Sequence, residues 1–450
     1  MLTGDNSILK RAVDAKKATD EASAKEQIQM AVLGNYKTNG ELDLEKLKTN
    51  LANIGATVIG EDFPIIAQLN GYTYEIDENS NLSYIEEFDT NIPEDAVAKM
   101  NYKYYSTLQA AIDKVKIDNK QTTILLLKDV SENVTVEANK NILLNLDSHK
   151  VTNASDAAII TLSGTLTINN GTLIGNYNSK VASICVNEGA EINLSNATVD
   201  RSSSGTNAWE TIQLYGNLNI DSGKINSPNS NAICSYANHN VNINISGTAE
   251  IEGTASERPT ISNQVGSKTT ITGGKVSSTR STTIINRGEL EISGTAEIEK
   301  TASGSSTISN EVGSKTIISG GNITSNGNIT ISNSGNLEVN GTAVISRTAP
   351  NPSDNSTNGT IVTSSANVNI LEGQILSDQG VALNVVGGTT TIGSSAYIAS
   401  GSTDENYPTV YCKNNVILNG GTIENTAGGY AINGYSKLTN NGGTVIGLVK

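Results

Sequence analysis

The chain has 450 residues and a formal net charge of −15, from 30 Lys and Arg against 45 Asp and Glu. This acidity argues against nucleic acid or an anionic membrane surface as the partner. The composition includes 42 Gly but only 15 Tyr, two Phe and one Trp. So few aromatic side chains do not suit an ordinary large α/β core. They suit a fold built from small repeated coils of the chain, which require small and β-branched residues.

The first 100 residues differ from the rest, because they hold 9 basic and 18 acidic side chains and a net charge of −9. Residues 5–7 are candidate helix caps, and apolar or small residues at helical spacing predict an amphipathic helix over residues 8–33. A second helix is expected over residues 44–54.

Strands are expected at residues 65–76 and 82–85, around a turn at 78–81. Together with the two helices they predict a small α+β module over residues 1–86. The acidic segment that follows, residues 87–100, is expected to link this module to a second domain.

The stretch GDNSILKRAVDAKKATDEASAKEQIQMAVL at residues 4–33, together with NGYTYEIDENSNLSYIE at residues 70–86, is similar to type IV pilin-like proteins of Gram-positive anaerobes. In that family the segment matching residues 2–33 is the soluble half of a long first helix, whose preceding apolar half crosses the membrane and packs the pilus core. The resemblance implies other pilin subunits as partners. This chain has no prepilin cleavage motif and no apolar run of the roughly 20 residues that a membrane helix requires, so no membrane span is expected within it. The alternative is a generic acidic helix and hairpin that caps the second domain.

The larger part of the chain is a tandem array. Residues 245–278 read ISGTAEIEGTASERPTISNQVGSKTTITGGKVSS, and residues 292–325, forty-seven positions later, read ISGTAEIEKTASGSSTISNEVGSKTIISGGNITS. Each copy holds two units, since a small residue or Gly followed by Val or Ile recurs at intervals of 20 to 32. This interval is typical of one coil of a β-solenoid. The small residues of the series are Gly171, Ala197, Gly223, Gly247, Gly274, Gly294, Gly321, Gly341, Gly373, Ser394, Gly421 and Gly443.

We expect a stack of about 12 to 14 coils over residues 101–450, with a helix over residues 105–115 that covers the open end of the first coil. The order of this helix and the apolar segments at 124–127, 134–136 and 142–146 is similar to the start of pectate-lyase-like right-handed β-helices on bacterial surfaces. The resemblance implies a mainly β chain whose larger domain is a right-handed parallel β-helix.

Two columns of residues support this register. Apolar side chains at matching places are expected to stack inward, about 4.8 Å apart. They are Ile184, Ile212, Ile233, Ile261, Ile284, Ile308, Ile331, Ile361, Leu383, Val410 and Ile432. Two places after four of them come Asn263, Asn286, Asn310 and Asn333. These predict an asparagine ladder, because Asn tolerates the left-handed turn conformation and its amide can bond to the copy in the next coil.

Many proteins of the pectate-lyase-like fold are polysaccharide lyases or hydrolases, so the resemblance also raises an enzymatic interpretation. The paired-Asp and Gly-His-Gly motifs that galacturonan hydrolases share are absent, and His149 and His239 lie in polar turns, where a solvated histidine is favoured. The acidic residues recur with the coils, which favours a solvated outer face over a calcium site. They are Glu250, Glu252, Glu289, Glu291, Glu297 and Glu299. We therefore predict no catalytic residue, no metal site and no cofactor.

The cysteines are predicted to be free thiols. Cys185 and Cys234 occupy equivalent outward places two coils apart, so about 10 Å should separate them, beyond the roughly 7 Å Cα limit of a disulfide. Cys412 has no neighbouring Cys or His in the sequence.

Exposed aromatic residues are the best indication of a ligand site. Tyr215 and Tyr236 fall at equivalent positions in adjacent coils, and Trp209 lies in the longer loop before them. Stacked flat rings suit the apolar side of a pyranose, so these three residues are the predicted glycan-binding residues. The alternative is a surface-stacked pair with Trp209 pinning its loop. The insertion at residues 347–359 is a second candidate loop, since insertions in solenoids often mark the binding face.

We expect a noncatalytic, pilin-like adhesin or glycan-binding stalk, outside the cell or on the surface of a bacterium, that binds a polysaccharide or a host glycan. The alternatives are a polysaccharide lyase or glycoside hydrolase of the β-helix fold, and a purely structural spacer.

Overall fold

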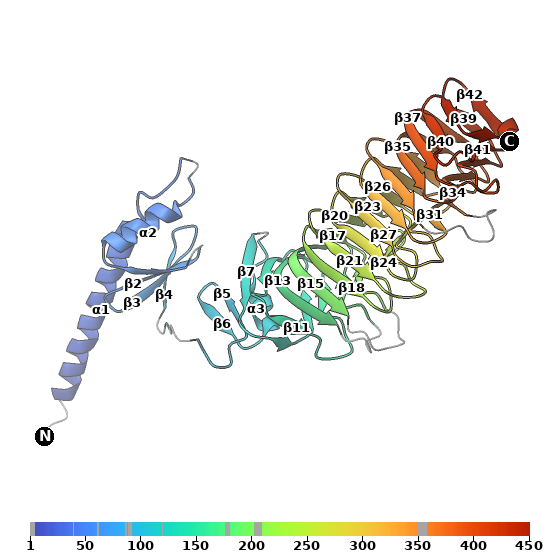
Figure 1. Cartoon of the computed structure of the whole chain (residues 1–450). Coiled ribbons are helices and arrows are strands. Elements are labelled where there is room, and N and C mark those ends of the chain that lie inside the picture. The colour runs from blue at the N-terminus through green and yellow to red at the C-terminus, as the bar shows by residue number, and fades with distance from the viewer. Residues whose placement is uncertain are drawn as a thin grey trace. The chain divides into compact units, whose positions relative to one another are not determined.

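The computed structural model describes residues 5–450 except 39, 61–62, 86–87, 89–91, 119, 176–180, 202–208 and 349–357. The chain divides into two compact units, Met1–Thr107 and Leu108–Lys450 (Figure 1). No helix in the described part of the chain is long and apolar enough to cross a membrane.

The first unit contains two helices and a four-stranded antiparallel sheet. The elements are α1 (Asp5–Val32), α2 (Leu44–Asn53), β1 (Thr57–Ile59), β2 (Ile65–Leu69), β3 (Tyr72–Ile76) and β4 (Leu82–Ile85), and the sheet order is β1-β2-β3-β4.

The C-terminal part of α1 packs on this sheet, whereas residues 10–20 of the helix are exposed. Ala24 and Ile28 are fully buried in the core that includes Tyr74 of β3. The Tyr74 hydroxyl donates a hydrogen bond of 3.0 Å to the backbone oxygen of Glu21. Among the described side chains, the apolar face predicted for the helix is therefore used only over its last turns.

The segment 65–76, expected as one strand, forms the hairpin of β2 and β3. Asn70 and Gly71 connect the two strands with φ angles of 53° and 85°. Two consecutive left-handed residues make the tight turn whose twist matches antiparallel strands. The single-strand prediction is wrong because the apolar pattern continues across this two-residue turn.

The unit ends with an antiparallel pair, β5 (Ala98–Met100) and β6 (Lys103–Tyr105). Asn101, with a φ of 54°, lies in the turn between them. A strand therefore lies inside residues 87–100, the segment expected to be a linker.

The helix expected over residues 105–115 is α3 (Leu108–Lys114), which belongs to the second unit and begins later than expected. The Glu132 carboxylate accepts a hydrogen bond of 2.9 Å from the backbone N–H of Leu108, where a negative charge stabilises a helix N-terminus. Leu108 and Ile112 are buried, and α3 packs against β7 and β9 of the first coils.

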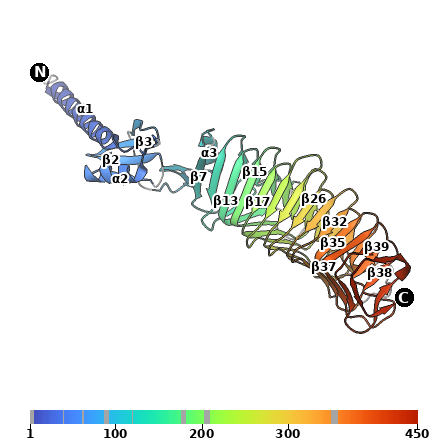
Figure 2. The ribbon, with the colours of Figure 1, turned by 90° about the horizontal axis from the view of Figure 1, so that it is seen from above.

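The second unit is a parallel β-solenoid of about 12 turns, which confirms the predicted fold class (Figures 1 and 2). One sheet takes one short strand from each coil. Its strands are β9 (Val134–Val136), β12 (Ile160–Leu162), β14 (Ile184–Val186), β16 (Ile212–Leu214), β19 (Ile233–Ser235), β22 (Ile261–Asn263), β25 (Ile284–Asn286), β28 (Ile308–Asn310), β31 (Ile329–Asn333), β34 (Gly359–Thr363), β36 (Leu383–Val385), β38 (Val410–Cys412), β41 (Tyr430–Asn433) and β44 (Leu448–Val449).

The other sheet takes one bent or two consecutive strands from each coil. Its strands in the second unit are β7 (Gln121–Leu126), β8 (Val130–Ser131), β10 (Asn141–Asn145), β11 (Lys150–Thr152), β13 (Thr165–Gly175), β15 (Glu191–Arg201), β17 (Asn217–Ile220), β18 (Gly223–Ser227), β20 (Asn242–Ile245), β21 (Glu250–Gly253), β23 (Lys268–Ile271), β24 (Lys275–Ser278), β26 (Glu289–Ile292), β27 (Glu297–Lys300), β29 (Lys315–Ile318), β30 (Asn322–Ser325), β32 (Asn336–Val339), β33 (Val344–Arg347), β35 (Val368–Ser377), β37 (Thr390–Ser400), β39 (Val416–Leu418), β40 (Thr422–Asn425), β42 (Leu438–Asn440) and β43 (Thr444–Ile446). A 3-10 turn, η1 (Tyr435–Lys437), precedes β42.

The apolar column expected from the sequence faces the interior of the short-strand sheet. Parallel pairing places Ile184 opposite Ile212, and the column continues coil by coil to Ile432. All eleven of these side chains, including Ile261, Ile284, Ile308 and Ile331, are 0% exposed. Each one contributes roughly 1.5 to 3 kcal/mol through burial of its apolar surface.

The four asparagines form a chain of amide hydrogen bonds along the stack. The Nδ2 atom of each of the first three donates to the Oδ1 of the next coil, at 2.7 Å from Asn263 to Asn286, 2.9 Å from Asn286 to Asn310 and 2.6 Å from Asn310 to Asn333. All four are strand residues without a positive φ. The expectation of a left-handed turn conformation is therefore wrong, and the need for an amide on each coil is the reason for Asn here.

Small residues at the bend of the long sheet alternate between Gly and Ala. Gly274 is level with Ala249, and a Cβ at Gly274 would lie 2.4 Å from the Ala249 backbone oxygen. The column is Gly171, Ala197, Gly223, Ala249, Gly274, Ala296, Gly321, Ala343, Gly373, Ala396, Gly421 and Gly443. Four members of the expected series, Gly247, Gly294, Gly341 and Ser394, lie two residues earlier. In these coils an Ala two residues later occupies the bend.

Candidate functional site

Tyr215 and Tyr236 lie side by side at the ends of β16 and β19. Parallel pairing aligns Leu214 with Ser235, which makes the two tyrosines level. Their ring centroids are 4.8 Å apart and the ring planes are inclined by 37°. Both side chains are half-buried, so each presents part of a ring to solvent.

His239 extends this pair. Its ring meets Tyr215 edge-on, with centroids 4.9 Å apart and an angle of 78° between the planes. Its Nδ1 lies 3.5 Å from the Glu188 carboxylate of the preceding coils. His239 is partly buried, with its side chain 29% exposed, because the stacking of coils brings residues from three turns to one place.

A polar row borders the tyrosines on the outer side of the strands. Gln213 donates a hydrogen bond of 3.0 Å from Nε2 to the Tyr215 hydroxyl, and its Oε1 lies 3.5 Å from the Cys185 Sγ. Gln213 is level with Cys185 on one side and Cys234 on the other. The two thiols are thus two coils apart, as expected, and both are free.

Burial raises the pKa of the Cys234 and Cys412 thiols. Cys234 is 8% exposed although its place on the strand points outward. Desolvation raises the pKa of Cys234 to about 12. Cys412, also free and buried, has its pKa raised to about 12 by the same cause. Neither thiol is a reactive nucleophile at neutral pH.

Glu210 connects the tyrosines with Trp209. Its Oε1 lies 3.5 Å from the Tyr236 hydroxyl, and its Oε2 is buried without a hydrogen-bond partner among the described residues. Burial, followed by the Glu210 charge, raises the pKa of Tyr236. Trp209 is 38% exposed, but no ring contact joins it to either tyrosine in the described part of the structure.

The structure thus brings together two of the three predicted glycan-binding residues and places the third beside Glu210. The sequence did not indicate His239, Gln213, Glu188 or Glu210 as members of this cluster. Most of the loop before Trp209, residues 202–208, lies outside the described residues, as do residues 349–357 of the second candidate loop.

Outside this cluster, the repeated acidic residues alternate with lysines on neighbouring coils. Lys275 pairs with Glu299 at 2.6 Å, and Lys268 pairs with Glu291 at 2.8 Å. These partly exposed pairs each contribute little to stability. No group of three or more His, Cys, Asp or Glu able to hold a metal ion occurs among the described residues.

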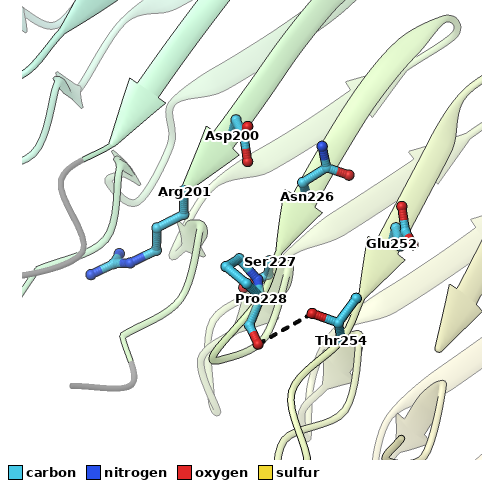
Figure 3. A pocket seen from close by; sticks show the side chains of 7 residues that line it. All are labelled: Asp200, Arg201, Asn226, Ser227, Pro228, Glu252 and Thr254. Carbon is cyan, nitrogen blue, oxygen red and sulfur yellow. Dashed lines mark hydrogen bonds between the residues drawn. The ribbon is translucent and has the colours of Figure 1, made fainter. Parts of the chain in front are cut away.

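A shallow hollow of about 370 Å³ lies beside the ends of β15, β18 and β21 (Figure 3). Asp200, Asn226 and Glu252 are level in the pairing of these strands and line its outer side. The hollow has no aromatic lining, and Glu252 is already paired with Lys224 at 3.0 Å. It therefore offers no aromatic ring on which a sugar could stack, and no unpaired couple of residues that could act as general acid and general base.

Comparison with protein-family models, with curated proteins and with solved structures gives no match to this chain.

Proposed function

We propose that this chain is a noncatalytic glycan-binding protein, in which the faces of Tyr215 and Tyr236 hold a sugar polymer. The stacked pair carries the proposal, since two flat, partly exposed rings on adjacent coils match the apolar faces of successive sugar residues. Polar groups that can orient hydroxyls stand beside the rings, in Gln213, Glu188 and Glu210.

The proposal extends to a pilin-like adhesin or stalk on the surface of a bacterium, with other pilin subunits as further partners. The resemblance of residues 4–33 and 70–86 to pilin-like proteins supports this part. It is consistent with a first unit in which α1 buries its C-terminal part and leaves residues 10–20 exposed. A solenoid of repeated coils supports display, because it places a binding face along an extended stack.

Binding to a panel of plant, bacterial and host glycans, followed by calorimetry on any hit, tests the proposal. Tyr215→Ala and Tyr236→Ala should each weaken binding about three- to tenfold, equivalent to the roughly 0.5–1.5 kcal/mol of an aromatic contact. Tyr411→Ala is the matched control, because Tyr411 lies on the outer side of the same sheet, in β38. Equal loss in all three variants, or a glycan that binds regardless of both site changes, would contradict the assignment.

The same incubations separate the alternatives. New reducing ends or unsaturated products, abolished by changing one acidic residue, would indicate an enzyme. A panel without any binding would favour a structural spacer.

A further inference from the structure

One interior column of the solenoid carries charge. It occupies the last position of the second strand of each coil, where the chain leaves the long sheet. In order, its members are Gly175, Arg201, Ser227, Gly253, Ser278, Lys300, Ser325, Arg347, Ser377, Ser400 and Asn425. The three cations are 3%, 1% and 1% exposed, in chain order.

Small neighbours make room for each cation. Arg201 lies between Gly175 and Ser227, and Lys300 lies between Ser278 and Ser325. The coils on both sides thus leave space for a long side chain to lie within the stack.

Two of the three charged groups, those of Lys300 and Arg201, donate to loop carbonyls, whereas Arg347 Nη2 donates to the Ser377 hydroxyl at 3.3 Å. Lys300 Nζ donates to the backbone oxygens of Arg280 and Ala302, at 3.0 and 2.9 Å. Arg201 Nη1 donates to those of Val181 and Glu210, at 3.0 and 2.8 Å. A buried cation is tolerated when it has such partners, so Lys300 and Arg201 each hold together two loops that leave the same edge.

The near-identical repeats show that the coil itself does not require the cation. Gly253 and Lys300 are forty-seven residues apart, follow the same sequence ISGTAEIE and precede the same Thr-Ala-Ser. The copy with Gly253 forms the same strand pairing as the copy with Lys300. The strand pairing of a coil therefore does not depend on a cation at this position.

Arg201 is the cation whose loop leads to the aromatic cluster. Its partner Glu210 is also the residue whose carboxylate faces the Tyr236 hydroxyl. The next residue is fixed as well, since Thr211 N donates to the Asn231 backbone oxygen at 2.9 Å. Figure 3 shows the Arg201 side chain, which also borders the outer hollow, directed away from Asp200 and Asn226.

We infer that Arg201 is a positioning residue for the candidate site: its guanidinium fixes the backbone of Glu210 and so holds Trp209 and the Glu210 carboxylate beside the Tyr215–Tyr236 pair. The expected effect of Arg201 on glycan binding rests on the proposed function. Its effect on the position of Trp209 and Glu210 does not depend on that function.

Trp209 is the only Trp in the chain, so its emission reports on this segment alone. Arg201→Met removes the donors and keeps a long side chain, and we expect it to raise acrylamide quenching of Trp209 about twofold through local opening. Arg201→Lys should restore most of the protection, because Lys300 shows that an ammonium reaches two carbonyls at this position. Lys300→Met is the matched control, since it removes an equivalent buried cation from another coil and should leave Trp209 quenching unchanged.

Should Arg201→Met fail to fold, Arg201→Gln replaces it, with an intermediate increase expected. The inference would be overturned if a folded neutral variant of Arg201 showed the same Trp209 quenching as the unmodified chain. It would also be overturned if Lys300→Met raised the quenching as much as the Arg201 variant does. A glycan that the panel identifies should bind Arg201→Met more weakly and Lys300→Met normally. If no glycan binds, the proposed function fails, whereas the quenching result still decides the role of Arg201.

Discussion

The asparagine ladder permits a quantitative test of how the polar interior stabilises the solenoid. Asn286 is 0% exposed, and its Nδ2 donates to Asn310 Oδ1, to the Lys315 backbone oxygen and to Thr316 Oγ1, at 2.9, 2.9 and 3.1 Å. Its Oδ1 accepts from Asn263 Nδ2 at 2.7 Å, and also from a backbone N–H in the following turn. Asn286→Ala removes all of these hydrogen bonds.

Several partners keep a second hydrogen bond, which limits the cost. Asn263 Nδ2 still donates to the Glu289 backbone oxygen at 2.8 Å, and Asn310 Oδ1 still accepts from the hydroxyls of Ser314 and Thr316. The backbone N–H of Gly288 loses its side-chain acceptor. With about 1 kcal/mol for each net hydrogen bond and roughly 1–3 kcal/mol for a buried group left unpaired, we expect a loss of about 2–4 kcal/mol.

Native-state hydrogen exchange is the suitable assay, because a repeat array opens locally rather than in one step. Amide protection in β22, β25 and β28 should fall by the stated free energy, with a smaller effect on distant coils. Asn333→Ala should cost less, since Asn333 lies at the end of the ladder and its Nδ2 donates to the Gly335 backbone oxygen. Ser309→Ala, at a half-buried outward position of β28, should change stability by about 0.5 kcal/mol or less. An Asn286→Ala effect no larger than this control would refute the reasoning.

Two further predictions concern the bend and the thiols. Gly274→Ala should destabilise the chain by about 1–2 kcal/mol more than Gly313→Ala in denaturant unfolding. Both glycines have a positive φ, but only at Gly274 would an added Cβ lie 2.4 Å from the Ala249 backbone oxygen. Equal losses of stability in the two variants would contradict this close approach. Burial raises the pKa of Cys234 and Cys412 from 9.0 to about 12, so these thiols lose their protons at lower pH in the unfolded chain than in the folded chain. The stability that the two protonated thiols contribute should therefore be fully present below about pH 9 and decline as the pH rises toward 12. Urea unfolding across this range should show a flatter profile in the variant with both cysteines changed to Ala, and identical profiles would argue against their burial.

The sequence alone determined the repeating architecture of the second unit. A parallel stack requires like residues at like places, so Ile284 and Asn286 reappear in neighbouring coils as apolar and amide columns. The level positions of Tyr215 and Tyr236 follow from the same periodicity. The alternation of Gly274 with Ala249 was missed, because small residues also occupy the turn just before each bend.

Only the tertiary structure decided the contacts that join different corners of the coils. The Glu132 carboxylate accepts a hydrogen bond from the first residue of α3, which lies 24 residues earlier in the chain. His239 contacts Tyr215 and Glu188, which belong to other coils of unequal length. Arg201 is buried among small neighbours and holds the Glu210 backbone. Such contacts depend on loop paths and on the space left by adjacent coils, which a period in the sequence does not specify.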